Sequence, residues 1–288
     1  MTKSKDFATN DLVSTQWLND HLGSPDVCII DASWYLPAMK RDPKAEFLAS
    51  HILHAQFFDI DAFSDQKSPL PHMLPPPEQF SAMARKLGLG DGKRIVCYDG
   101  MGLFSAARAW WMFKVFGHED VAVLDGGLPK WLKEGRPVED GPARPVQPRH
   151  FTARHNGTME SSLADVKEAL AGGTAQWLDA RPAPRFRGEV AEPRPGVRSG
   201  HAPGQINVPW SLMVNEDGTV KSRAALEETF RAQGVDLHRP TIASCGSGVS
   251  GCSLALALTL IGHHHHTLYD GAWSEWGARD DLPAVTGA

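Results

Sequence analysis

Short apolar runs alternate with amphipathic stretches along most of this 288-residue chain. Runs that read VCIIDA, RIVCYD and VAVLDG are typical of buried strands. The stretches 77–89 and 162–173 have helical spacing, with Pro77 suited to a first helical turn and Ser162 to an N-cap. Alternating strands and helices predict an α/β fold, in which helices cover both faces of a parallel sheet.

One ordered series of local features occurs twice along the chain. CIIDAS, SHILHAQFFDID and RIVCYDG in the first half are matched by WLDAR, SGHAPGQINVPW and TIASCGSG in the second. Each series continues with a helical stretch, a Gly-His pair, an Asp-Gly pair and a tryptophan, which is Trp131 or Trp276. Matching features lie about 145–150 residues apart, which predicts one type of domain used twice.

A proline-rich segment separates the two copies. Pro142, Pro145 and Pro148 are spaced three apart, and proline at this density opposes helix and central strand. We therefore expect two tandem domains at 8–140 and 159–285, each a small parallel sheet flanked by helices, joined by a semi-extended linker at 141–158.

Composition excludes several classes of function. A net charge of −5 argues against a non-specific nucleic-acid binder, and no apolar stretch is long enough to span a membrane. The polar start has no apolar core of a secretory signal, so the expected location is the cytoplasm. The cysteines form no CxxC pair, which indicates neither a disulfide scaffold nor a cysteine zinc site, and we expect no metal.

The segment TIASCGSGVSGCSLALALTLIG places Cys245 between a short apolar strand and a long apolar helix. In an open parallel sheet, ligands bind beyond the carboxyl ends of strands, where this cysteine falls. Gly246 and Gly248 let the backbone curl around its sulfur, and turn N–H groups and the helix N-terminus favour a thiolate there. Cys245 is therefore a candidate nucleophile; the alternative is a buried cysteine that packs as a small hydrophobic residue.

The same residues permit two other interpretations. Gly246, Gly248 and Gly251 spell GxGxxG between a strand and a helix, and Asp270 follows 19 residues after Gly251, as in a dinucleotide-binding fingerprint. Against this, the motif leaves the cysteine unexplained, and Asp270 has a counterpart, Asp125, in the other copy. A phosphate-cleaving CxxxxxR loop would need arginine at position 251, where glycine stands.

The loop CGSGVS, in the second of two related α/β domains, resembles the active-site loop of rhodanese-type sulfurtransferases. The resemblance covers roughly residues 10–285 and includes FFDID, SPLPHMLP, GLFSAARAWWMF, RFRGEVAEPRPG and GHAPGQINVPW in that order. Basic residues in the loop mark the branch that uses thiosulfate. Here Gly246 and Ser247 follow the cysteine, so the loop is similar to that of the branch that uses 3-mercaptopyruvate.

The resemblance implies a role for each residue that matches a family motif. Arg185 and Arg194 match a pair that clamps the substrate carboxylate, for which planar guanidinium groups are suited. Asp61 and His72 match residues that reach from the first domain and form, with Ser247, a Ser–His–Asp arrangement that moves a proton. The remaining loop positions expected to bind substrate are Gly246, Gly248, Val249 and Ser250.

The activity that follows is transfer of sulfur from a small 2-oxo thiol, through a Cys245 persulfide, to a thiol such as thioredoxin or to cyanide, with no cofactor. Thiosulfate as donor, and a non-catalytic nucleotide-binding or sulfur-relay module, are the alternatives. Counted through the Gly-His and Asp-Gly pairs, Gly100 is the counterpart of Cys245, so the first copy is expected to be catalytically silent.

Overall fold

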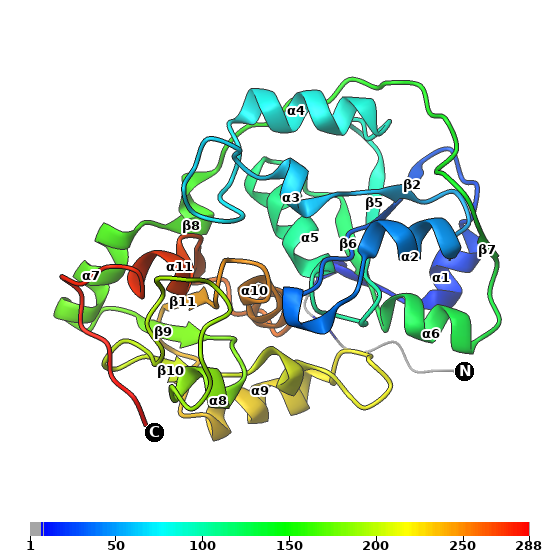
Figure 1. Ribbon diagram of the computed structural model, residues 1–288. Coiled ribbons are helices and arrows are strands. Elements are labelled where there is room, and N and C mark those ends of the chain that lie inside the picture. Colours follow the sequence, from blue (N-terminus) through cyan, green and yellow to red (C-terminus); the bar gives the residue numbers. More distant parts are fainter. Residues whose placement is uncertain (1–6, 8, 288) are drawn as a thin grey trace.

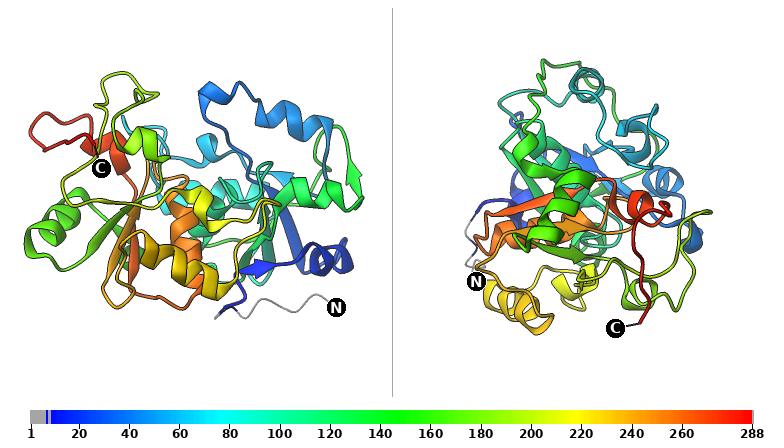
Figure 2. Two further views of the ribbon diagram at one scale, coloured as in Figure 1. Left: turned by 90° about the horizontal axis from the view of Figure 1, so that it is seen from below. Right: turned by 90° about the vertical axis from the view of Figure 1, so that its left-hand side faces the viewer.

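The computed structural model describes residue 7 and residues 9–287. The chain forms two halves that lie side by side (Figures 1 and 2). The first half holds a parallel sheet in the order β1-β6-β5-β2-β4. Its strands are β1 (Leu12–Val13), β2 (Val27–Asp31), β4 (Gln56–Phe57), β5 (Arg94–Tyr98) and β6 (Val121–Leu124).

The second half repeats this topology in the order β10-β9-β11-β12-β8, again with every neighbouring pair parallel. Its strands are β8 (Glu160–Ser161), β9 (Gln176–Asp179), β10 (Ile206–Asn207), β11 (Thr241–Ser244) and β12 (His266–Tyr269). Numbered along the chain within each half, both sheets have the order third, second, fourth, fifth, first. The predicted tandem α/β fold with parallel sheets is confirmed.

Helices cover the sheets in both halves. The first half has α1 (Thr15–Asp20), α2 (Pro43–Ala49), α3 (Ile60–Phe63), α4 (Pro77–Lys86), α5 (Ala106–Val115) and α6 (Gly127–Lys133). The second has α7 (Leu163–Gly172), α8 (Ala183–Phe186), α9 (Arg223–Ala232), α10 (Gly251–Leu260) and α11 (Ala272–Trp276). Local signals were sound: Pro77 opens α4, and the Ser162 hydroxyl caps α7 by accepting from the Asp165 N–H.

Two helices lie between the sheets and pack against each other, namely α5 and α10 (Figure 1). Each directly follows the central strand of its own half, β5 or β11. Almost all their side chains are buried, which suits helices that are apolar on every side rather than on one stripe. The two halves therefore share one continuous hydrophobic core around this helix pair.

The repeat extends to individual side chains. The ring of His51 stacks on Phe47 at 3.9 Å, and the ring of His201 stacks on Phe186 at 3.8 Å. In both pairs Nδ1 of the histidine contacts the carbonyl of the phenylalanine, at 2.8 and 2.9 Å. In the first half His51 also belongs to a small antiparallel ribbon formed by β3 (His51–Ile52) and β7 (Val138–Glu139).

The segment after β7 has no helix or strand up to residue 156, as expected of a linker, but it packs along the first half. Phe151 is fully buried against Phe80 and Phe113, and its carbonyl accepts from Nε of Arg85 at 2.9 Å. The domain boundaries expected from the sequence remain predictions, and residue 8, the first of them, lies outside the described residues. No helix in the described chain is long and apolar enough to cross a membrane.

The packing of Phe151 makes a testable prediction. Replacing Phe151 by alanine is expected to lower the free energy of unfolding by about 3–5 kcal/mol, because it leaves a cavity among buried aromatic rings. Val146→Ala, at an exposed position of the same segment, is the matched control and should change it by less than about 0.5 kcal/mol. Urea denaturation measures both; equal stability of the two variants would contradict the assignment of this segment to the first core.

Candidate active site

Cys245 directly follows β11, at the carboxyl end of the second sheet, and is almost fully buried. The loop that it opens runs through Gly246 to Ser250 and enters α10. The carbonyls of Cys245 and Gly246 accept from the N–H groups of Trp273 and Ser274, at 3.0 and 2.9 Å. These bonds anchor the loop to α11 and leave its own N–H groups for other acceptors.

The counterpart of this loop in the first half already holds an anion. Strand register pairs Tyr98 with Asp31, as it pairs Ser244 with Asp179, so the residue after each central strand corresponds: Asp99 in the first half and Cys245 in the second. The prediction that Gly100 is the counterpart was wrong by one residue. The first loop is one residue longer before its helix, and the landmarks used for counting lie beyond that insertion.

The Asp99 carboxylate shows what such a loop binds. One of its oxygens accepts from the N–H groups of Phe104, Ser105 and Ala106, each at 2.8 Å, and the other accepts from Met101 at 2.8 Å. Four backbone donors therefore converge on one carboxylate, a nest for an anion at the start of α5.

The N–H groups of the Cys245 loop are available for an equivalent role. Within the described chain, those of Ser247 to Ser250 donate to no protein acceptor. Buried backbone donors are costly to leave unpaired, so the loop favours a bound anion. A cysteine at the start of this loop, where the first half has an aspartate, is the central feature of the site.

Ser247, His72 and Asp61 form the hydrogen-bonded chain that the sequence resemblance implied. Nε2 of His72 lies 3.0 Å from the Asp61 carboxylate, and Nδ1 lies 2.9 Å from the Ser247 hydroxyl. Nδ1 also lies 3.2 Å from the Ser247 carbonyl; in the tautomer that donates Nε2–H to Asp61, Nδ1 accepts from the Ser247 hydroxyl. His72 belongs to the first half and Ser247 to the second, so the chain spans the boundary between the two halves.

Trp34 supports this chain from the first half. Its indole N–H donates to the Asp61 carboxylate at 3.1 Å, and its ring meets the His72 ring edge to face at 4.8 Å. The hydrogen bond from His72 lowers the pKa of the Asp61 carboxyl, with smaller contributions from Trp34 and Arg194. A charged Asp61 holds the His72 ring in one tautomer and orientation. Asp59, two residues earlier, caps α3 instead.

Both predicted arginines reach the cysteine loop. Nη2 of Arg194 donates to the Ser247 hydroxyl at 3.3 Å, and Nη2 of Arg185 lies close enough to Gly246 that a side chain there would meet it at 3.0 Å. Burial lowers the pKa of Arg194, and neighbouring Arg185 acts in the same direction. Two poorly solvated guanidinium groups side by side favour an anion between them. Arg187, by contrast, is an exposed partner of Glu189.

Glu192 is a residue of the site that the sequence reasoning missed. Its buried carboxylate accepts from Nε and Nη2 of Arg185 at 3.3 and 2.5 Å, and from Nη1 of Arg181 at 2.8 Å. Glu192 thus occupies the edge of the Arg185 guanidinium formed by Nε and Nη2. The edge formed by the two Nη atoms is left for a ligand carboxylate. The EPR sequence contained the signal, because a carboxylate two residues before a functional arginine can orient a neighbouring one.

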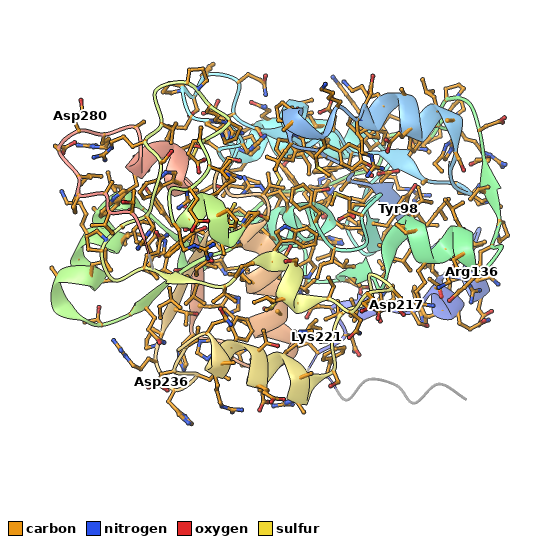
Figure 3. All side chains as sticks on the ribbon, turned by 60° about the horizontal axis from the view of Figure 1, so that its bottom comes forward. Tyr98, Arg136, Asp217, Lys221, Asp236 and Asp280 are labelled. Atoms are coloured by element: carbon orange, nitrogen blue, oxygen red, sulfur yellow. The ribbon has the colours of Figure 1, made fainter. Side chains whose placement is uncertain are left out.

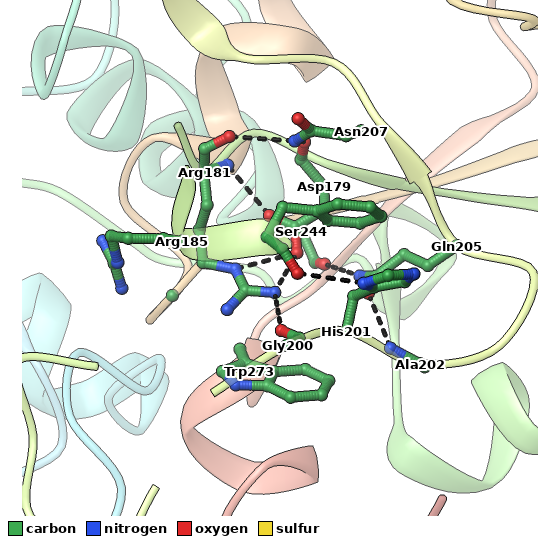
Figure 4. A network of polar contacts seen from close by, with 12 residues as sticks. Asp179, Arg181, Arg185, Gly200, His201, Ala202, Gln205, Asn207, Ser244 and Trp273 are labelled. Carbon is green, nitrogen blue, oxygen red and sulfur yellow. Dashed lines mark hydrogen bonds and ion pairs between the residues drawn. The ribbon is translucent and has the colours of Figure 1, made fainter. Parts of the chain in front are cut away.

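Arg181 gives this group a rigid base. Its guanidinium donates to Asp179 and to the carbonyl of Gly200, and it lies over the ring of Trp273 at 4.6 Å (Figure 4). It is fully buried, as is Asp179 at the end of β9. Arg185 and Arg194 line the pocket, whereas Arg181, Asp179 and Glu192 do not, and the two carboxylates offset much of the charge of Arg181 and Arg185.

A small pocket collects most of the predicted site residues. Its lining is formed by Trp34, Leu36, Phe104, Pro182, Arg185, Arg194, Trp210, Cys245, Gly246, Ser247, Val249 and Ser250. Gly248 does not line the pocket. Its φ of +79° turns the loop, and an added Cβ would lie 2.6 Å from the Asp270 carboxylate. Aromatic and apolar residues from both halves thus form much of the wall, together with Arg185 and Arg194.

The other thiols lie in surroundings unlike that of Cys245. Burial raises the pKa of Cys28, of Cys97 and of Cys252, which keeps these groups as neutral thiols. Cys252 donates to the Gly248 carbonyl at 3.1 Å, behind the loop. Over the described residues, no group of three or more metal-ligating side chains is placed to hold a metal ion.

Comparisons with known proteins agree with this fold. A family model described as a rhodanese-like domain matches residues 14–134 and 162–279. The 3-mercaptopyruvate sulfurtransferase of Escherichia coli K12 is 46% identical over 278 residues, which are 96% of this chain and 98% of that protein. A mitochondrial thiosulfate/3-mercaptopyruvate sulfurtransferase of Arabidopsis thaliana is 41% identical, over 94% of this chain and 77% of that protein.

A solved structure shows the same likeness in three dimensions. The crystal structure of SseA from Escherichia coli, described among 3-mercaptopyruvate sulfotransferases, superimposes with a TM-score of 0.85 at 44% identity. The match covers 93% of this chain and all of that chain. The class is defined by two α/β domains with parallel sheets and by a cysteine loop after the central strand of the second. This chain belongs to the rhodanese family.

The charge balance around Glu192 predicts how the pocket sorts anions. Glu192→Gln removes one negative charge, so a dianion should gain over a monoanion by about 1 kcal/mol, or about fivefold in relative affinity. Sulfate and pyruvate are suitable probes, and their affinities can be measured as protection of Cys245 from alkylation. Glu189→Gln, in the exposed pair with Arg187, is the control and should leave the ratio unchanged. An unchanged ratio in Glu192→Gln would refute this charge balance.

Proposed function

We propose that this protein transfers sulfur from 3-mercaptopyruvate, through a persulfide on Cys245, to a thiol or cyanide acceptor, and releases pyruvate. The protein is a sulfurtransferase, the activity named for relatives that match over nearly the whole chain. The single observation that carries the mechanism is the placement of the Cys245 thiol in a nest of free backbone donors beside two arginines.

In the first step the Cys245 thiolate attacks the sulfur of the 2-oxo thiol. An S–S bond forms, the bond between sulfur and C3 of the substrate breaks, and its electron pair passes to the carbon as the enolate of pyruvate. Arg185 and Arg194 hold the carboxylate and the 2-oxo group, and so stabilise the negative charge that spreads onto the enolate oxygen. The outer sulfur, a persulfide anion, is held by the N–H groups of the loop.

The enolate needs a proton to become pyruvate. Ser247 lies in the pocket, and its hydroxyl is hydrogen-bonded to His72, which in turn bonds to Asp61. In our proposal the proton of the substrate thiol enters this chain and returns to carbon through the Ser247 hydroxyl. Asp61 stays ionised throughout and stabilises a protonated His72.

In the second step an acceptor thiolate attacks the outer sulfur of the persulfide. The Cys245–sulfur bond breaks, its electron pair returns to Cys245 as a thiolate, and the acceptor leaves as a persulfide. With a dithiol acceptor such as thioredoxin, the second thiol displaces the sulfur as sulfide and closes a disulfide. We propose a cytoplasmic setting, supported by four cysteines that are all free.

Features of the structure argue against two alternative functions, a thiosulfate donor and dinucleotide binding. Thiosulfate carries two negative charges, whereas Glu192 and Asp179 offset much of the positive charge of Arg185 and Arg181, which favours a singly charged carboxylate donor over a dianion. In the dinucleotide interpretation, Asp270 would bind a ribose. It is instead buried in an ion pair with Arg108, and Gly251 packs against β11, where an added Cβ would lie 2.9 Å from Ser244.

Mass spectrometry after treatment with 3-mercaptopyruvate tests the covalent step. The wild-type chain is expected to gain one sulfur atom, because the Cys245 thiolate keeps it as a persulfide, and Cys245→Ala should gain none and lose transfer activity. Cys252→Ala is the matched control, since this thiol lies behind the loop, and it should still gain the sulfur. Full transfer activity in Cys245→Ala would disprove the assignment of the nucleophile.

Steady-state kinetics tests the donor. We expect kcat/KM for 3-mercaptopyruvate to exceed that for thiosulfate by at least about tenfold, which corresponds to about 1.4 kcal/mol in transition-state binding. Cyanide should serve as acceptor in both assays so that only the donor changes. A higher specificity constant for thiosulfate would overturn the proposed substrate while leaving the persulfide mechanism in place.

A further inference from the structure

The boundary between the two halves is built from matched contacts. An aspartate directly after β12, Asp270, accepts from the N–H of Leu74 in the first half at 2.7 Å. An aspartate directly after β6, Asp125, accepts from the N–H of Val220 in the second half at 2.7 Å. Figure 3 labels Asp217 and Lys221, which flank Val220 in the segment that reaches the first half. Each half thus holds the other's loop by the same bond.

The helix pair at the centre adds a second matched contact. Nη1 of Arg108, on α5, donates to the carbonyl of Gly248 at 3.4 Å. The hydroxyl of Ser253, on α10, donates to the carbonyl of Leu103 at the same distance. Arg108 and Ser253 occupy equivalent positions in the two copies, and so do Leu103 and Gly248. The two donor groups nevertheless differ, since one is a guanidinium and the other a hydroxyl. The repeat is therefore broken on the side that faces the cysteine loop.

The larger side chain of Arg108 connects both parts of the active site. It is fully buried, donates from Nη1 to the Asp270 carboxylate at 2.5 Å, and donates from Nη2 to the carbonyl of His72. With its bond to Gly248, this one guanidinium binds the main chain of the His72 loop and the main chain of the Cys245 loop. An added Cβ at Gly248 would meet both charged groups, so the loop and the ion pair fit closely.

His72 needs such support because of its backbone. Its φ of +61° lies in the left-handed region, which costs a residue with a side chain of this size free energy and persists where the surroundings impose it. Arg108 donates to the His72 carbonyl, and Asp270 accepts from the N–H of Leu74, two residues later. The main chain is therefore fixed both at the strained residue and just after it. This conformation points the ring at Ser247 and Asp61.

We propose that Arg108 and Asp270 are a positioning pair for sulfur transfer, which sets His72 against the Cys245 loop across the boundary of the two halves. Neither residue lines the pocket, so the pair acts through His72. A buried ion pair gives little net stability compared with apolar packing, whereas its directional bonds specify one geometry. This inference rests on the proposed role of His72 in proton transfer.

A double-mutant cycle with a matched control tests the pair. Asp270→Asn should lower kcat for 3-mercaptopyruvate at least tenfold with KM changed less than threefold, per active site titrated by alkylation of Cys245. In a His72→Asn background the same change should lower kcat by less than twofold further, because the group that it positions is gone. Asp125→Asn removes the matched charge beside the Val220 N–H and should change kcat less than twofold.

Three outcomes would overturn the proposal. These are equal losses of kcat in Asp270→Asn and Asp125→Asn, a loss that is undiminished in the His72→Asn background, and a loss that disappears once folded protein is counted. If Asp270→Asn does not fold, Arg108→Lys takes its place, since lysine keeps the charge but cannot bond to three acceptors in the same directions.

A crystal structure of the Asp270→Asn protein separates this inference from the proposed function. The proposal requires that the distance between His72 Nδ1 and the Ser247 hydroxyl lengthens beyond hydrogen-bonding reach, and a distance that stays near 2.9 Å refutes it whatever the kinetics show. If His72→Asn alone leaves kcat unchanged, the proton-transfer role of His72 fails instead, and this distance still decides whether the pair positions the ring.

Discussion

Buried backbone N–H groups need an acceptor, and the two loops that follow the central strands of this protein meet that need differently. In the first half the Asp99 carboxylate accepts from four of them and permanently fills the nest. In the second half Cys245 stands at the same strand position, and the N–H groups of Ser247 to Ser250 donate to no acceptor in the described chain. One fold thus yields a structural loop in one copy and a reactive loop in the other.

Both halves contribute residues to the site because the two copies of the domain pack against each other. The cysteine, the arginines and the serine belong to the second half, whereas His72, Asp61 and Trp34 belong to the first. Because α5 and α10 share one core, the halves cannot shift without disturbing buried apolar surface. The hydrogen-bonded chain of Ser247, His72 and Asp61 can therefore span the boundary with distances near 3 Å.

Electrostatics explains why so many charged groups can surround one buried pocket. Arg181 and Arg185 are each paired with Glu192, and Arg181 also with Asp179, so most of the charge is balanced within the protein. The same carboxylate that balances Arg185 also fixes the plane of its guanidinium, so charge and direction are set together.

Local features were accessible from the sequence because they depend on neighbours along the chain: the strand–helix alternation, the Pro77 and Ser162 helix starts, and Cys245 at a strand end. The family motifs also pointed to Arg185, Arg194, His72 and Asp61. Asp99 as the counterpart of Cys245, the grip of Glu192 on Arg185, and the Arg108–Asp270 pair were decided only by tertiary structure. A one-residue difference in loop length shifts a count along the chain without moving a strand in space, and a buried ion pair depends on which distant segments the fold brings together.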